Sequence, residues 1–166
     1  SVYTFIPKNA CTSLRFSIAV SNGFLKDISD LHWIHENNDS FQPSKREVAI
    51  AKYTFIVLRC PFTRIVSCFF DQVVFNKYFD FTDSTGNKLS LSFYDFLQIV
   101  KSQNRFDRNE HWRNQSDFLH YENYDDYFSL EQFPEAINKL SNKGLKFFDT
   151  RNKMKHSLIG LNKVDG

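Results

Sequence analysis

Thr-Phe-Ile-Pro-Lys-Asn-Ala-Cys-Thr-Ser-Leu-Arg, at residues 4–15, is the stretch that decides how this chain folds. Its apolar start predicts a β-strand over residues 2–6, and the later pattern predicts a helix from Ser13 with Thr12 or Ser13 as its N-cap. A strand, a tight turn and a helix N-terminus gather backbone N–H groups around an anion, and Lys8 adds positive charge at the mouth. The stretch therefore predicts an anion-binding loop, although it lacks the glycine spacing of a Walker loop.

A second strand-to-helix turn follows further along the chain. Residues 53–58 form an apolar, β-branched run, which predicts a buried strand that ends at Arg59. Pro61 suits the first position of a helix, and apolar residues then recur at three- and four-residue steps. In this prediction Arg59 and Ser67, in the second helical turn, converge on one phosphate. Two such turns predict a ligand with two separated anionic groups.

Strands and helices alternate along the rest of the chain. The pattern predicts further strands at residues 124–128 and 145–148, and helices that begin with capping boxes at Ser44 and Ser92. Such alternation is typical of the α/β class, with a parallel sheet, helices on both faces and ligands at the carboxyl ends of the strands. We expect a single domain over residues 1–166. Because the chain starts on a strand without Met, we also expect it to be a fragment or a trimmed form of a longer protein.

Composition excludes several classes of function. The net charge is +2, with 21 basic and 19 acidic residues, so the sequence gives no sign of a nucleic-acid partner. Three cysteines without regular spacing predict neither a disulfide framework nor a zinc site, and we expect no metal. No apolar stretch reaches the length that spans a membrane, so no transmembrane segment is predicted in this chain. The oligomeric state is not predicted.

Three motifs, in order, carry a resemblance to a known family. They are Pro-Lys-Asn-Ala-Cys-Thr-Ser at residues 7–13, Leu-Arg-Cys-Pro-Phe-Thr-Arg-Ile-Val-Ser-Cys-Phe at residues 58–69, and Glu-His-Trp at residues 110–112. The chain resembles the carbohydrate sulfotransferases that use 3'-phosphoadenosine 5'-phosphosulfate (PAPS), in the branch with chondroitin, dermatan and uronyl sulfotransferases. The resemblance implies a P-loop-like sulfotransferase fold, PAPS as the sulfuryl donor, no metal, and a carbohydrate or glycan acceptor. It implies the cytoplasm for a bacterial protein and the Golgi lumen for a eukaryotic one with a trimmed N-terminal anchor.

The resemblance also implies roles for individual residues. Lys8 would contact the 5'-phosphosulfate and neutralise the bridging oxygen as the sulfuryl group leaves. Arg59 and Ser67 would hold the 3'-phosphate, and Arg64 is either a further contact or a structural ion pair. The implied cofactor-binding residues are Lys8, Asn9, Ala10, Cys11, Thr12, Ser13, Arg15, Arg59 and Ser67.

The reaction needs a base that takes the proton from the attacking hydroxyl, and histidine suits neutral pH. His111 is the first candidate because it lies in the matched Glu-His-Trp segment. His32 and His35 come next, because related sulfotransferases place a base between the two phosphate motifs, and Glu110 is a further candidate. His120 and His156 are the other histidines of the chain. Lys8, His111, His32 and His35 are thus the predicted catalytic residues.

The sequence departs from the family at Cys60, where an acid usually follows the arginine and orients it. This departure keeps open a second hypothesis, that the chain is a catalytically degenerate module that binds nucleotide or glycan. A third reading is a P-loop-like kinase, which is disfavoured because the Gly-Lys-Ser/Thr sequence is absent.

Overall fold

The computed structural model describes residues 1–26, 33–75, 84–86 and 91–148. Within these residues β1 (Val2–Thr4), β2 (Thr54–Leu58) and β3 (Asp126–Ser129) form a parallel sheet in the order β1-β2-β3. This confirms the predicted α/β class with a parallel sheet. Because the strands are parallel, their carboxyl ends meet at one edge, and the turns that follow β1 and β2 are neighbours there.

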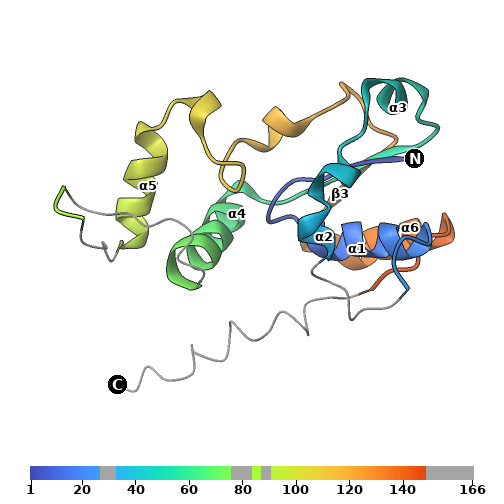
Figure 1. Cartoon of the computed structure of the whole chain (residues 1–166), viewed down its shortest axis with the longest axis horizontal. Helices are drawn as coiled ribbons and strands as arrows, with labels where there is room; N and C mark the ends of the chain where they lie inside the picture. Colours follow the sequence, from blue (N-terminus) through green and yellow to red (C-terminus); the bar gives the residue numbers. More distant parts are fainter. Residues whose placement is uncertain (27–32, 76–83, 87–90, 149–166) are drawn as a thin grey trace, which may run out of the picture.

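The helical elements lie around this sheet. They are α1 (Cys11–Ser21), α2 (Trp33–Glu36), η2 (Asn38–Phe41), α3 (Lys45–Ile50), α4 (Pro61–Cys68), η3 (Phe69–Phe75), α5 (Phe93–Ser102), η4 (Arg105–Asp107), η5 (Gln115–Phe118), η6 (Leu130–Gln132) and α6 (Phe133–Asn142). η3 is π-helical, whereas the other η elements are 3-10 helices. Figure 1 shows α5 at one end of the long axis, α1, α3 and α6 toward the other end, and α4 between them.

Both faces of the sheet are covered. Tyr3 and Phe55 stack on one face, with ring centroids 4.9 Å apart, and pack with the fully buried Leu14 of α1 and with Leu140 of α6. Burying a leucine of this kind stabilises the fold by roughly 1.5–3 kcal/mol. On the other face Ile6 and Ile56 pack against Tyr124, together with Phe118 from η5 and Tyr121.

A separate apolar cluster joins α4, η3 and α5 to the Glu-His-Trp segment. It contains the buried residues Cys68, Phe69, Phe96 and Trp112. The indole N–H of Trp112 donates to the side-chain oxygen of Gln103 at 2.8 Å, and its ring meets Phe96 edge-on at 5.4 Å. Trp112 therefore anchors the Glu-His-Trp segment to this cluster, and His111 is its neighbour in the chain.

Most of the predicted helix starts are confirmed. The capping boxes at Ser44 and Ser92 form with Glu47 and Asp95. The predicted N-cap of the first helix is wrong, because α1 begins at Cys11 and the N-cap is Ala10 in a left-handed conformation.

The predicted strand at residues 145–148 is also wrong. The backbone N–H groups of Lys146 and Phe148 donate to the hydroxyls of Ser21 and Ser17 at 3.0 and 2.9 Å, so this segment lies along α1 instead of pairing with the sheet. Among the helices of the described residues, none has the length and apolar character to cross a bilayer.

Candidate anion-binding site

The turn between β1 and α1 has an unusual backbone. Lys8 and Ala10 have φ of 72° and 57°, in the left-handed region that residues with a Cβ rarely adopt. Each such residue costs of order 1–3 kcal/mol and persists only where its surroundings hold it. Alternation of left- and right-handed residues turns backbone N–H groups toward one concave point, which is how a chain forms an anion nest.

The N-terminus of α1 reinforces this geometry. Among the described residues no side chain caps it, and its first turn contains no acidic residue. By contrast α3 and α5 begin with complete capping boxes. The first N–H groups of α1, at Cys11, Thr12 and Ser13, therefore point out of the helix with the positive end of its dipole behind them.

Side chains from elsewhere hold this turn in place. Arg64 donates from Nε to the carbonyl of Pro7 at 3.0 Å, and Arg59 donates from Nη1 to the carbonyl of Lys8 at 2.9 Å. Asn9 is fully buried and donates from Nδ2 to the carbonyl of Val57 at 2.9 Å and to Gln115 at 2.6 Å. These bonds occupy the carbonyls of Pro7 and Lys8, while the side-chain oxygen of Asn9 is buried and has no partner among the residues that the structure describes.

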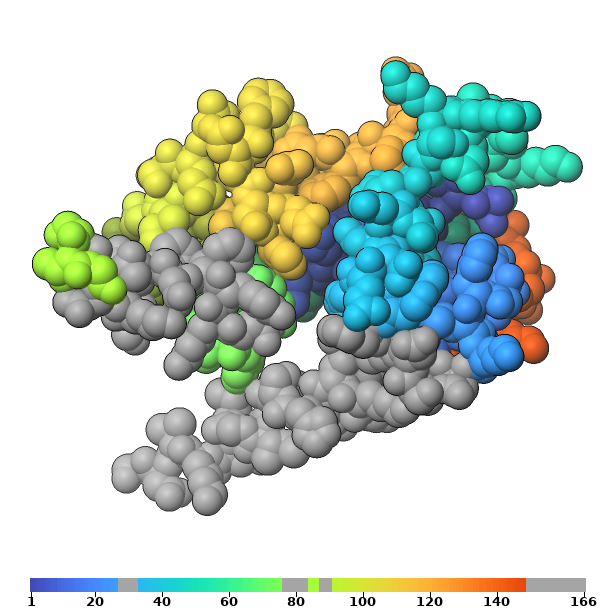
Figure 2. All heavy atoms as spheres, viewed as in Figure 1, coloured from blue at the N-terminus to red at the C-terminus, as the bar shows by residue number. Residues whose placement is uncertain are grey.

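Gln115 ties the two turns together. Its side-chain oxygen accepts from Asn9 and from the backbone N–H of Arg59 at 3.0 Å, and its Nε2 donates to the carbonyl of Arg59 at 2.7 Å. Figure 2 shows the gold segment around residue 110 packed against the dark blue N-terminal segment, in agreement with the bond between Asn9 and Gln115. One glutamine thus fixes the spacing between the first turn and the end of β2.

Arg59 uses two of its three guanidinium nitrogens in bonds within the protein. Its Nε donates to the hydroxyl of Thr63 at 3.2 Å and its Nη1 to Lys8, so within the described part of the chain Nη2 has no partner. Ser67 is half-buried on α4 and follows Arg59 by eight residues.

Arg64 has a structural role. It is only 5 % exposed and donates to three backbone carbonyls, those of Pro7, Glu110 at 3.1 Å and Arg113 at 2.7 Å. Burial lowers the pKa of its guanidinium from the ordinary value. Arg64 therefore joins the first turn to the Glu-His-Trp segment through carbonyls, and within the described ranges it forms no ion pair of the kind considered above.

Lys8 faces a carboxylate. Its ammonium forms an ion pair with Asp71 at 2.9 Å, in the π-helical η3. Side chains of Lys8 and Asp71 are 18 % and 36 % exposed, so the pair is open to solvent and to a ligand. π-helical turns are frequent at functional sites, because the wider turn redirects the side chains that follow it.

In the neutral form of His111 the lone pair lies on Nε2, because Nδ1 donates to Asn109. Its Nδ1 lies 2.7 Å from the side-chain oxygen of Asn109, which also accepts the backbone N–H of His111 at 3.0 Å, so Nδ1 carries the hydrogen. Burial lowers the pKa of His111, Glu110 opposes that shift, and the charges of Lys8 and Asp71 act on it as well. His111 therefore shares the electrostatic environment of the Lys8–Asp71 pair.

Other predicted residues lie differently. Arg15 is 4 % exposed and packs its guanidinium over the rings of Phe5 and Phe41, at 4.6 and 5.5 Å, while bonding to Asn38. These contacts favour a structural role, and its ligand role stays a prediction. His35 is exposed on α2, and His32 and His156 lie outside the described residues.

Three residues that build the site, Asp71, Gln115 and Glu131, had no predicted role. Gln115 stands three residues after the Glu-His-Trp motif, so its position beside a motif was an available signal, whereas the contact of Glu131 across 71 residues gave none. Asp71 had none, since the helical period used for prediction does not anticipate a π-helix.

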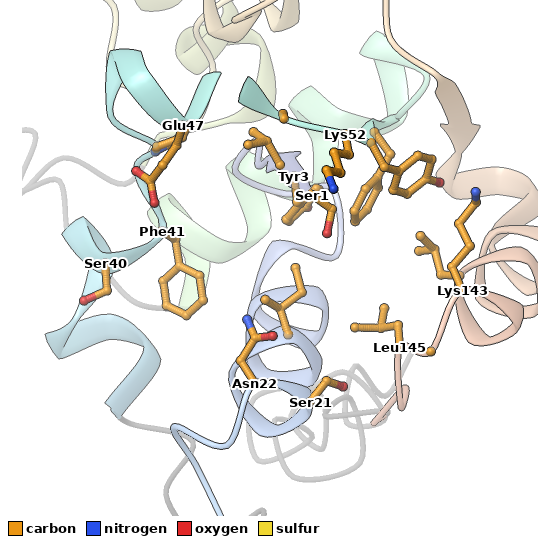
Figure 3. A pocket seen from close by; sticks show the side chains of 18 of the residues that line it. Ser1, Tyr3, Ser21, Asn22, Ser40, Phe41, Glu47, Lys52, Lys143 and Leu145 are labelled. Atoms are coloured by element: carbon orange, nitrogen blue, oxygen red, sulfur yellow. The ribbon is translucent and has the colours of Figure 1, made fainter. Parts of the chain in front are cut away.

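A cavity of about 740 Å³ lies elsewhere, at the amino ends of β1 and β2 (Figure 3). Tyr3, Lys52 and Lys143 are among its lining residues, whereas none of the predicted catalytic or cofactor-binding residues lines it. It is therefore distinct from the site at the carboxyl edge. In the described part of the chain, no cluster of three histidine, cysteine or acidic side chains is arranged to hold a metal ion.

The carboxyl edge of the parallel sheet therefore carries an uncapped, strained turn and a neighbouring arginine, a geometry that suits anionic groups of the phosphate or sulfate type. The model of the sulfotransferase family matches residues 2–157, and the chain belongs to that family. It has an α/β sulfotransferase fold. Comparison with curated proteins and with solved structures finds no match.

Proposed function

We propose that this sulfotransferase transfers a sulfuryl group from PAPS to a hydroxyl of a carbohydrate acceptor. The observation that carries the proposal is the β1–α1 turn, with left-handed Lys8 and Ala10 and no side-chain cap on α1. Its N–H groups suit the 5'-phosphosulfate end of the donor. The carbohydrate acceptor rests on the resemblance of the three motifs.

The residues at the carboxyl edge fit a donor with two anionic groups. Backbone N–H groups of residues 10–13, with the hydroxyls of Thr12 and Ser13, would bind the phosphosulfate, whereas the N–H of Asn9 donates to the carbonyl of Ile6 at 3.2 Å. Nη2 of Arg59 and the hydroxyl of Ser67 would bind the 3'-phosphate, because a guanidinium offers a fork that matches phosphate oxygens. The donor supplies an activated sulfuryl group when bound, and the protein supplies position and charge.

Two side chains would serve the chemistry. Nε2 of His111 would take the proton from the acceptor hydroxyl while that oxygen forms a bond to sulfur. The bond from sulfur to the bridging phosphate oxygen breaks, and Lys8 would neutralise the charge that grows on this oxygen. The products are the sulfated acceptor and adenosine 3',5'-bisphosphate.

The first experiment measures donor recognition by thermal shift. At about 100 times its dissociation constant, adenosine 3',5'-bisphosphate is expected to add roughly 2.7 kcal/mol of stability, or about 5–10 °C in Tm for a chain of this size. AMP lacks the 3'-phosphate, so we expect a much smaller shift, and ATP and NAD serve as further comparisons. Equal shifts with AMP and the bisphosphate would contradict the 3'-phosphate site.

The second measurement is transfer itself, with PAPS and a panel of glycans. Sulfation of a glycan hydroxyl supports the proposal. Strong binding of the bisphosphate without transfer to any acceptor would instead support the degenerate binding module. Membership of the sulfotransferase family sets aside the kinase alternative.

A further inference from the structure

The N-terminus of α4 is capped from a distant part of the chain. Cys60 occupies the N-cap position and its own side chain makes no cap bond. Instead Oε1 of Glu131, in η6, accepts the backbone N–H of Cys60 at 2.9 Å and lies 3.3 Å from the hydroxyl of Thr63. A carboxylate is thus bound at the start of α4, where the positive end of the helix dipole favours it.

The Glu131 side chain is also held by its own segment, through Ser129. Its Oε2 accepts the hydroxyl of Ser129 at 2.7 Å, and the same hydroxyl accepts the backbone N–H of Glu131 at 3.2 Å. The Ser129 bond and then the Cys60 bond lower the pKa of Glu131 to about 2. The side chain is therefore an anion at every pH at which the enzyme would be assayed.

Thr63 connects this anion to Arg59. The Thr63 hydroxyl accepts Nε of Arg59 at 3.2 Å. Its single hydrogen lies between two acceptors, the carbonyl of Cys60 at 3.1 Å and Oε1 of Glu131 at 3.3 Å, and Glu131 also holds the backbone N–H of Cys60. With Nη1 donating to Lys8, two nitrogens of the guanidinium are fixed and its plane is set, so Nη2 points to one place.

We propose that Glu131, acting through Thr63, positions Arg59 for the 3'-phosphate and supplies the carboxylate that the sequence lacks at Cys60. This inference rests on the proposed function, because the 3'-phosphate is the group that Arg59 would bind. Glu131 is a positioning residue, since it acts on the ligand only through Arg59. The departure at Cys60 is then compensated by a residue 71 positions away in the chain.

The test compares Glu131→Ala with Glu135→Ala, which removes an exposed carboxylate from the first turn of α6. Affinities for adenosine 3',5'-bisphosphate and AMP are measured by calorimetry. Glu131→Ala is expected to weaken the bisphosphate about tenfold and to leave AMP unchanged, as expected from the loss of one charge-assisted bond. Glu135→Ala should change neither affinity.

A rescue separates positioning from general stability. Cys60→Asp places a carboxylate at the N-cap of α4, where aspartate caps well. Combined with Glu131→Ala, it should restore most of the bisphosphate affinity. Equal weakening of both ligands by Glu131→Ala, or failure of the rescue, would overturn the inference.

Thr63→Val covers the case in which the Glu131 variants do not fold. It breaks the relay on an exposed residue while Glu131 still caps α4, and it should lower the preference for the bisphosphate over AMP. An unchanged preference would overturn the inference. Absence of that preference in the unaltered protein would instead contradict the proposed 3'-phosphate site.

Discussion

The two strand-to-helix turns of this protein are built in opposite ways. The turn after β1 has a strained backbone and no cap, and its only cation, Lys8, is paired with Asp71. The turn after β2 has ordinary backbone, proline at the start of α4 and a carboxylate from Glu131 at its N-cap. The first turn therefore presents backbone N–H groups, whereas the second presents side chains.

Hydrogen bonds also connect the two turns, and their donors lie on the second turn. Arg59 and Arg64, which belong to the second turn, donate to the carbonyls of Lys8 and Pro7 in the first. Bonds of this kind supply the surroundings that hold strained residues in place. The second turn thus supports the first, and the two are expected to fail differently when they are altered.

The largest expected effect tests whether the first turn serves chemistry and the second serves binding. Lys8→Ala should lower turnover by about 10²–10³-fold, because the charge that Lys8 neutralises grows only as the bond breaks. Arg59→Ala should weaken bisphosphate binding by about 10–100-fold, since its contact is the same in the ground and transition states. Steady-state kinetics and calorimetry measure the two effects.

Lys45→Ala, on the exposed surface of α3, is the control and should change neither quantity. If Lys8→Ala alters only the Michaelis constant for PAPS, the leaving-group role is wrong. The first turn would then serve donor binding, as the second turn does, and not the chemical step.

The next effect tests the dependence of the first turn on the second. Arg64→Met keeps the apolar stem but leaves three carbonyls without their donor, and we expect a loss of about 3 kcal/mol in the free energy of unfolding. For a chain of this length that is roughly 6–12 °C in Tm. Arg46→Met, on an exposed position of α3, should stay within about 0.5 kcal/mol. A loss under about 1 kcal/mol for Arg64→Met would show that the first turn holds its own geometry.

The sequence predicted those parts of the fold whose signals are local. Apolar runs marked β1 and β2, and the pairs Ser44–Glu47 and Ser92–Asp95 marked two helix starts that the structure confirms. The N-cap of α1 was missed, because the usual signal is a side-chain cap and this helix has none. The strand predicted at residues 145–148 does not form, because serine hydroxyls of α1 take the N–H groups of Lys146 and Phe148.

The candidate site was predictable in its motifs but not in its connections. Lys8, Arg59 and His111 could be singled out from residue type and order. Their partners Asp71 and Glu131 could not, because a π-helix and a contact across 71 residues leave no periodic pattern in the sequence. Side-chain bonds between distant segments become visible only when the strands are placed in register.

The smallest expected effect is a shift in the pH dependence of activity, and it concerns His111 in the Glu-His-Trp segment. A base must be neutral to act, so activity should fall as pH drops through the pKa of His111. Burial places that pKa below the ordinary value of 6.5, and the acidic limb of kcat/KM should therefore lie below pH 6.5. Asn109→Asp puts a carboxylate against the Nδ1 hydrogen, which favours the imidazolium and should move the limb up by about one pH unit. Asn114→Asp, the same change on an exposed residue of the same loop, should leave the limb in place.

His111→Ala should abolish the limb, while His32→Ala and His35→Ala should keep it. If the limb survives in His111→Ala and is lost in either of the other two, the base lies between the two phosphate motifs, and the bond from Asn109 serves only to shape the loop.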